Sequence, residues 1–227
     1  QWIAYVADGD TDEVSELYLV PSDGSAAAVK VNAPLVNNGD VNWFQFSPDG
    51  GRLFYSADGD VDDRNELYGI ALPNPGAPYK INGPLGANNT VYDFDFSSDG
   101  ALVAYMTLNQ SSGQVQLYSV VLPDGAPLKL NGPLAADESV GFFGFSPDDS
   151  YVAFTIYRGD YEDAILYRAD PLSGNRQLLV DPPTGGVSDF LFTPDSARLI
   201  YSVYEDEYTH RELWVVAAAG GAAARVN

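Results

Sequence analysis

A short phrase that recurs along the chain constrains its fold more than any other feature. It reads Phe-Ser-Pro-Asp-Gly at 46–50, and variants of it occupy 96–100, 145–149 and 192–196. Two further markers recur in the same order, at intervals near 50 residues. One is a Leu-Tyr or Leu-Trp pair, and the other is a basic residue two positions before an asparagine. The 227 residues therefore read as five copies of one unit within a single domain. The units span 1–35, 36–85, 86–134, 135–183 and 184–227.

Each unit reads as four short strands. In the second unit the alternation of apolar and polar residues predicts strands over 41–46, 53–56, 67–71 and 79–81. The Ser-Pro-Asp-Gly phrase predicts a tight turn between the first two, because proline presets φ, aspartate caps the turn and glycine accepts a positive φ. No amphipathic helix is expected, and the alanine-rich stretch 217–224 is interpreted as a loop because Gly220 and Gly221 interrupt it.

Four-stranded units at this spacing predict an all-β fold, a β-propeller of about five blades. One such sheet cannot bury both of its faces alone, whereas stacking against neighbours can. Tyr5 aligns with Tyr55, so the first unit lacks the strand equivalent to 41–46. We therefore expect four first strands but five second, third and fourth strands.

The unit resembles the TolB-type, WD-like propeller repeats over the whole chain. The likeness lies in the Phe-Ser-Pro-Asp-Gly turn, the strand after it, the Glu-Leu-Tyr strand and the basic-flanked closing strand. That resemblance implies a protein-binding scaffold of the bacterial envelope, or a propeller that gates a serine peptidase. The chain has no Gly-x-Ser-x-Gly elbow and a single histidine, His210. The peptidase role is therefore not carried over.

The charge is strongly acidic: 32 Asp and Glu against 11 Lys and Arg give a net charge of −21. Phosphate backbones and anionic membrane surfaces are repelled by such a chain, so we expect no nucleic-acid partner. The sequence has no cysteine, which excludes disulfides and thiol catalysis. No apolar run is long enough to predict a membrane span.

The loops between the second and third strands of the first two units carry matched acidic residues. Both loops place carboxylates at relative positions 1, 3, 5 and 9, and Ca²⁺ prefers such hard oxygen ligands. They resemble the calcium hairpins of integrin-type propellers, except that Glu replaces the last Asp and that Glu13 and Asp63 stand where glycine is expected. The alternative is a solvated acidic hairpin. The predicted calcium ligands are Asp8, Asp10, Asp12 and Glu16, and Asp58, Asp60, Asp62 and Glu66.

Most aromatic residues fall at in-phase strand positions and are expected in the core between blades. Four loop tyrosines could instead form an exposed recognition patch or pack over neighbouring blades: Tyr157, Tyr161, Tyr204 and Tyr208. The first strands are otherwise apolar, and Asp93, Asp95 and Asp189 occur there at positions that do not match. This scatter argues against catalytic carboxylates in a central channel.

The sequence favours a non-enzymatic, extracytoplasmic module, at the cell surface, outside the cell or in the periplasm. It would bind another protein or assemble with copies of itself. The alternatives are a regulatory segment of a larger enzyme such as a serine peptidase, and a propeller enzyme acting on carbohydrate. The strand at 3–7 is expected to have an open edge. Another copy could fill that edge and build a filament, residues before Gln1 could fill it, or a three-stranded blade could be tolerated.

Overall fold

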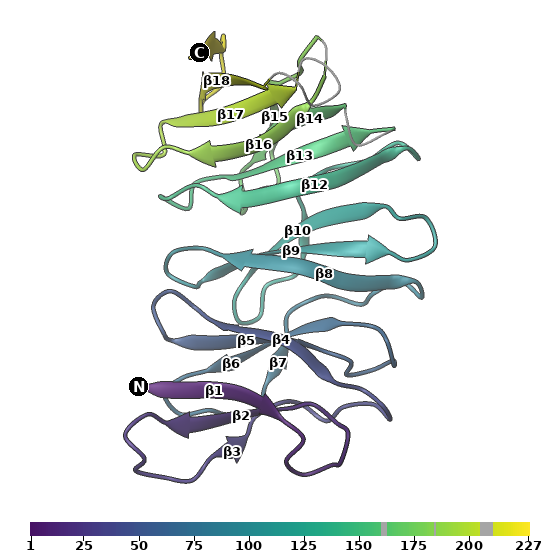
Figure 1. Cartoon of the computed structure of the whole chain (residues 1–227), viewed down its shortest axis with the longest axis vertical. Coiled ribbons are helices and arrows are strands. Elements are labelled where there is room, and N and C mark those ends of the chain that lie inside the picture. The colour runs from purple at the N-terminus through teal and green to yellow at the C-terminus, as the bar shows by residue number, and fades with distance from the viewer. Residues whose placement is uncertain (160–162, 184, 205–210) are drawn as a thin grey trace.

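The computed structural model describes residues 1–159, 163–183, 185–204 and 211–227, and in these residues every regular element is a β-strand. The strands form five antiparallel sheets, of which the first has three strands and the others have four (Figure 1). The predicted all-β architecture and the missing first strand are both confirmed. None of the described segments is a helix that could cross a membrane.

Each sheet falls within one sequence unit and keeps the chain order of its strands. The first sheet contains β1 (Trp2–Ala7), β2 (Glu16–Pro21) and β3 (Val29–Lys30). The second contains β4 (Val41–Phe46), β5 (Arg52–Ala57), β6 (Glu66–Ala71) and β7 (Tyr79–Lys80). The third contains β8 (Asn89–Phe96), β9 (Leu102–Asn109), β10 (Val115–Val121) and β11 (Leu128–Lys129). The fourth contains β12 (Glu138–Phe145), β13 (Val152–Arg158), β14 (Ala164–Ala169) and β15 (Arg176–Val180). The fifth contains β16 (Val187–Phe192), β17 (Arg198–Tyr204), β18 (Arg211–Ala217) and β19 (Ala224–Arg225).

The recurring phrase forms the turn that its chemistry predicts. The Ser47 hydroxyl donates to the Asp49 carboxylate at 2.6 Å, and the same carboxylate accepts the Gly51 amide at 2.9 Å. Gly50 has φ of 67°, a conformation that glycine adopts at little cost. The matching turns in the other units repeat the hydroxyl–carboxylate hydrogen bond. The phrase therefore fixes the connection between the first and second strands of a unit.

The asparagine of the third sequence marker ties the closing strand to the third strand. The Asn82 Oδ1 atom accepts the Leu67 amide at 2.6 Å, while its Nδ2 donates to the Gly83 carbonyl at 3.0 Å. The side chain of Asn131 accepts the Leu117 amide in the same way, at 2.8 Å. These buried amides replace ladder hydrogen bonds that the two-residue fourth strands cannot make.

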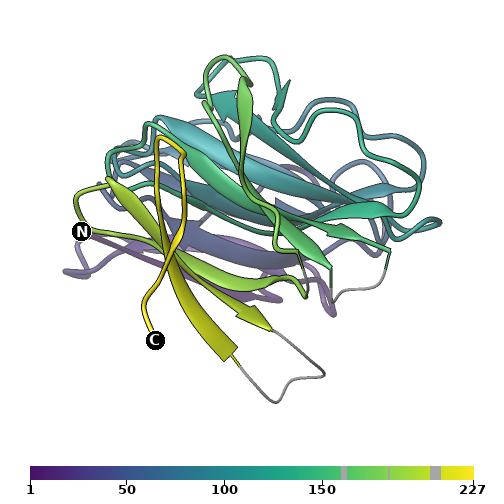
Figure 2. The ribbon, with the colours of Figure 1, turned by 90° about the horizontal axis from the view of Figure 1, so that it is seen from above.

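The cores lie between sheets. Four clusters of buried apolar side chains each combine residues of two consecutive sheets, and together they join all five into one stack. Figure 1 shows the stack with the N-terminus near one end and the C-terminus at the other, and Figure 2 shows the sheets overlying one another with changing strand directions. In the first sheet β1 pairs with β2, and no other described strand pairs with it. The proposals for what fills the free edge of β1 stay predictions.

Candidate functional site

The acidic hairpin of the first unit closes around a buried carboxylate. Glu16 is buried, and one of its oxygens accepts the Asp10 amide at 2.8 Å and the Tyr18 hydroxyl at 2.9 Å. Its other oxygen pairs with Lys30 Nζ at 2.8 Å, and the same ammonium reaches the Asp10 carboxylate at 2.7 Å. The lysine therefore lies between two carboxylates of the predicted calcium set.

These contacts decide the ionisation of the cluster. Burial raises the pKa of Glu16, but the hydrogen bonds from Lys30, the Asp10 amide and Tyr18 outweigh it and lower the pKa to about 2. Burial and the hydrogen bond to Glu16 raise the pKa of Tyr18 to about 12. The hydrogen bonds to Asp10 and Glu16 raise the pKa of the Lys30 ammonium. The cluster is thus a charged carboxylate and ammonium pair at neutral pH.

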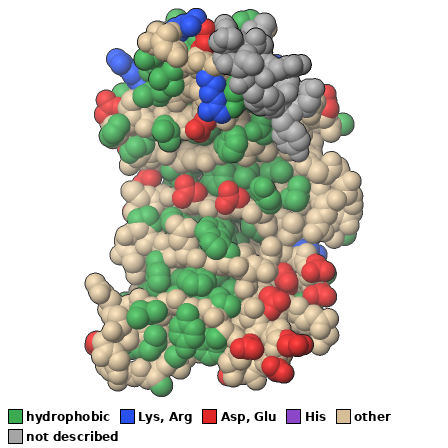
Figure 3. All heavy atoms as spheres, viewed as in Figure 1, with side chains coloured by type: hydrophobic (Ala, Val, Ile, Leu, Met, Phe, Trp, Pro, Cys, Tyr) green, Lys and Arg blue, Asp and Glu red, His purple; other side chains and the backbone are tan. Residues whose placement is uncertain are grey.

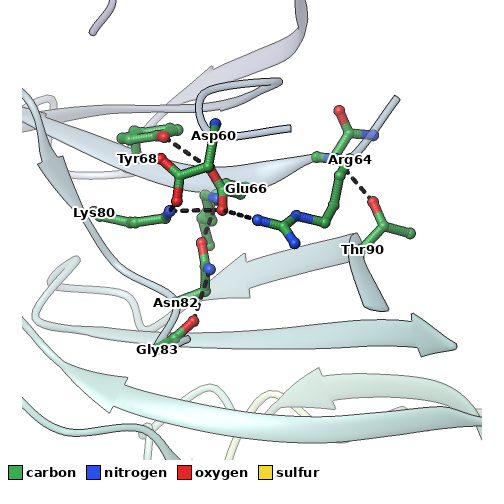
Figure 4. Close-up of polar contacts among 10 residues, drawn as sticks. Asp60, Arg64, Glu66, Tyr68, Lys80, Asn82, Gly83 and Thr90 are labelled. Atoms are coloured by element: carbon green, nitrogen blue, oxygen red, sulfur yellow. Dashed lines mark hydrogen bonds and ion pairs between the residues drawn. The ribbon is translucent and has the colours of Figure 1, made fainter. Parts of the chain in front are cut away.

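The second unit repeats the cluster with one addition (Figure 4). Glu66 accepts the Tyr68 hydroxyl at 3.0 Å, and Lys80 Nζ lies 2.6 Å from Glu66 and 2.7 Å from Asp60. Arg64 adds a second cation, whose guanidinium lies 3.4 Å from the Glu66 oxygen that pairs with Lys80. Two units therefore build the same ion pair from the Glu-x-Tyr strand and the closing lysine.

Backbone geometry in the hairpins explains two sequence features. A Cβ atom on Gly9 or on Gly59 would overlap the hydroxyl of the tyrosine that caps the cluster, Tyr18 or Tyr68. Both glycines are therefore needed for close packing. Glu13 and Asp63 have φ of 61° and 58°, the left-handed conformation that glycine adopts most readily, so both hairpins take this conformation at the positions where glycine was expected.

The last unit uses the same arrangement with different residues, and the third has lost it. Glu212 pairs with Arg225 and accepts the Trp214 indole N–H at 2.9 Å. In the third unit Gln116 stands in place of the glutamate, although Lys129 remains.

The structure brings together only part of the predicted calcium set. Asp10 meets Glu16 and Asp60 meets Glu66, each pair through a lysine. Three of the other carboxylates are exposed and one is buried beside Asn42. These are Asp8, Asp12 and Asp62, and Asp58. In the described part of the chain no three His, Cys, Asp or Glu residues gather as a metal-binding group. Calcium binding stays a prediction, and an ion there would have to compete with the lysine.

A second candidate site runs along the first strands of the sheets. Each of these four strands contains a β-bulge, where the register against the second strand shifts. Three aromatic side chains at these bulges are exposed: Trp43, Tyr92 and Phe142. Figure 3 shows hydrophobic side chains down the viewed face of the stack, with acidic ones beside the first two sheets. Three of the four bulges therefore carry an exposed aromatic ring at or beside the residue where the register shifts.

Two of these rings border a hollow between the second and third sheets. The hollow has a volume of about 240 Å³, and the Trp43 ring packs against Phe94 with centroids 4.4 Å apart. Its lining combines aromatic rings with amide and carboxylate groups: Asn42, Trp43, Ser56, Asn65, Val91, Tyr92, Asp93 and Phe94. Burial raises the pKa of Asp93 and of its neighbour Asp95, although each also accepts the next amide.

The sequence interpretation of this surface was wrong in one respect. Asp93 and Asp189 are not at unrelated positions: each is the residue at which pairing with the second strand resumes after the bulge, and each accepts the following amide at 2.8 Å. The signal for the exposed rings was present in the adjacent pairs Trp43-Phe44 and Phe142-Phe143, because neighbouring residues of a regular strand point to opposite faces.

The loop tyrosines give a different picture from the predicted patch. Tyr157 and Tyr204 lie within strands β13 and β17, not in the loops where they were expected, and both are half-buried. Tyr157 is edge-on to Phe142, and Arg211 lies over the Tyr204 ring. Tyr161, Tyr208 and His210 lie outside the described residues.

Comparison with known proteins gives the fold a name. A putative TolB from Agrobacterium tumefaciens superimposes with a TM-score of 0.52 at 17% identity, over 92% of this chain and 73% of that one. The chain has a β-propeller fold. TolB from Acinetobacter baumannii matches with a TM-score of 0.50 at 17% identity, over 99% of this chain and 52% of that one. No protein-family model and no curated protein matches the sequence.

Propeller-containing peptidases share the fold as well. A structure from a study of two prolyl endopeptidases matches with a TM-score of 0.63 at 14% identity, over 99% of this chain but only 34% of that one. The present chain thus spans about half of the Acinetobacter TolB and a third of the endopeptidase. At these identities the likeness shows the fold, which is shared by proteins with different activities.

Removing the lysine of the first cluster should destabilise the fold. Lys30→Met leaves the buried Glu16 carboxylate without its cation, so we expect a lower free energy of unfolding and a lower urea midpoint than for the native chain. Lys129→Met is the matched control, because its unit has Gln116 in place of the glutamate. Urea unfolding measures both, and equal effects would contradict the ion-pair interpretation.

The same cluster predicts a pH dependence. The pKa of Glu16 is about 2 in the folded chain against an ordinary value of 4.5, so its carboxylate stabilises the fold above the ordinary value and loses that contribution as the pH falls toward 2. Urea unfolding of the native protein and of Glu16→Gln should therefore differ most near neutral pH and converge in acid. A difference that does not change with pH would rule out this linkage.

Calcium binding is tested by thermal unfolding with Ca²⁺ and with a chelator. Saturation at a hundred times the Kd would add about 2.7 kcal/mol, and we expect a higher Tm with Ca²⁺ than with Mg²⁺. Lys30→Met should enlarge the effect of Ca²⁺, because it removes the competing ammonium from Asp10 and Glu16. Superimposable curves for both proteins, with and without Ca²⁺, would refute the calcium hypothesis.

Proposed function

We propose that the chain is a non-enzymatic binding module that holds a segment of another protein against the first strands of its sheets. The observation that carries the proposal is the set of exposed rings at successive β-bulges, Trp43, Tyr92 and Phe142. Exposed aromatic clusters are costly on a monomer's surface and are typical of interaction sites.

The chemistry beside the rings indicates the kind of segment. Asp93 and Asp95 lie on the same strand as Tyr92, and across the hollow the Asn42 side chain donates to that of Asn65 at 2.6 Å. The net charge of −21 adds a long-range attraction for cations. A segment with aliphatic or aromatic anchors next to Lys or Arg side chains fits this surface best.

Binding rather than catalysis is supported by the sequence. It has no cysteine, one histidine and no Gly-x-Ser-x-Gly elbow. We place the module outside the cytoplasm, as a proposal supported by its acidity and by the fold it shares with the TolB proteins. Fractionation of cells that express the natural gene tests this location.

The proposal is tested with peptides selected from a random display library on the immobilised chain. Tyr92→Ala should weaken the selected peptides by roughly 30-fold or more, as expected when an anchoring ring is removed. The ring of Tyr92 is exposed, so its loss should leave the fold intact. Leu172→Ala, which removes an exposed apolar side chain in the turn between β14 and β15, is the matched control.

Two outcomes would contradict the proposal. One is that the selections yield no peptide with measurable affinity. The other is that the selected peptides bind Tyr92→Ala and Leu172→Ala equally well. Cationic peptides should also lose affinity as salt screens the carboxylates.

A further inference from the structure

The outward face of the first sheet exposes side chains whose counterparts are buried in every other sheet. Ile3 is 50% exposed and Tyr5 is 38% exposed. The residues in register with Ile3 on the other second strands are completely buried. They are Leu53, Val103, Val152 and Leu199. Each of these four packs toward the preceding sheet, and no described sheet packs on this face of the first sheet.

The outward face of the fifth sheet shows the converse pattern. Leu213 is 37% exposed, whereas its counterparts on the other third strands are completely buried. These counterparts are Leu17, Leu67, Leu117 and Leu166, and each packs toward the following sheet. Val226 is 58% exposed, while Val31, Ile81 and Leu130, whose amides make the same hydrogen bond to the third strand, are buried.

The two end faces are therefore the two halves of one interface that the chain already builds four times. At each internal interface, a leucine of the third strand in one sheet shares a core with the second-strand residue of the next sheet. Leu17 and Leu53 form the first such pair, and Leu166 and Leu199 the last. The internal interface also carries a polar contact, since the Tyr55 hydroxyl accepts the Ala33 amide at 2.7 Å. Tyr5 offers the same hydroxyl on the exposed face.

We propose that a second copy of this chain covers each end face, with the fifth sheet of one copy stacked on the first sheet of the next. Leu213 and Val226 of one copy then contact Ile3 and Tyr5 of the other, as Leu17 and Val31 contact Leu53 and Tyr55 within the chain. This contact is head-to-tail, because the two faces differ. A head-to-tail contact leaves one face free at each end and adds further copies unless the array closes into a ring.

Charge opposes this stacking over long range and sets its salt dependence. Each copy carries −21, so association of copies is weak at low ionic strength and becomes stronger as salt screens the repulsion. The apolar contacts at the end faces are not screened. Rising association with rising salt thus separates this contact from the peptide binding proposed above, which salt weakens.

The test uses two variants of the full chain, Ile3→Asp and Leu213→Asp, each of which damages one end face only. Both residues are exposed, and circular dichroism and thermal unfolding verify that the variants fold. Light scattering and sedimentation from micromolar to millimolar protein, at about 0.15 M and about 1 M salt, should show concentration-dependent oligomers for the native chain. Each variant alone should be monomeric, with association weakened by roughly 30-fold or more.

Mixing the variants in equal amounts gives the decisive readout. Each variant retains the face that the other has lost, so the mixture should form a dimer and no larger species. Leu172→Asp, an exposed apolar position outside the end sheets, should associate like the native chain.

Three results would overturn the proposal. They are a native chain that stays monomeric at every concentration and salt, a Leu213→Asp or Ile3→Asp variant that still forms oligomers alone, and a mixture of variants that stays monomeric. The second result would indicate pairing of like faces.

Discussion

Burial of both faces of every sheet is the constraint on which this structure depends. A single twisted sheet of three or four short strands has no core of its own, and here all four apolar clusters lie between consecutive sheets. Leu53 and Leu67 lie on adjacent strands of the second sheet, yet they belong to different cores, one on each side of the sheet. The strands are therefore apolar on both faces, and their sequences show that.

Within a unit, one buried carboxylate organises the polar side of the structure. Glu16 and Glu66 each gather an amide of the hairpin, a tyrosine hydroxyl and the lysine of the closing strand. The glutamate thereby joins the hairpin and the third and fourth strands of its sheet. This explains why Glu-Leu-Tyr and the closing lysine occur together in the first two units, whereas Lys129 is kept beside Gln116 in the third.

Repeat count, strand order and the shortened first sheet could be predicted from the sequence, because each depends on local turn chemistry and on markers that recur in the same order in each unit. The partners of the acidic residues could not, since Lys30 is 14 residues from Glu16 in the chain and a list of carboxylates does not show where an ammonium will lie. The general expectation that strand aromatics lie in the core does not hold for Trp43 and Phe142, which lie at bulges: a bulge moves the strand register by one residue, and composition does not reveal it.

The confinement of contacts to neighbouring sheets has a consequence for how the molecule comes apart and how it arose. In such an array the stability of each unit depends on its own strands and the adjoining interfaces, as in a one-dimensional ladder. Amide hydrogen exchange would then be slowest in the third sheet, which β8 to β11 form, and faster toward both ends. The third sheet is the middle one, with two sheets on each side of it. A duplication or deletion of one whole unit leaves every remaining contact type intact, so the number of units can change during evolution while the unit itself is kept.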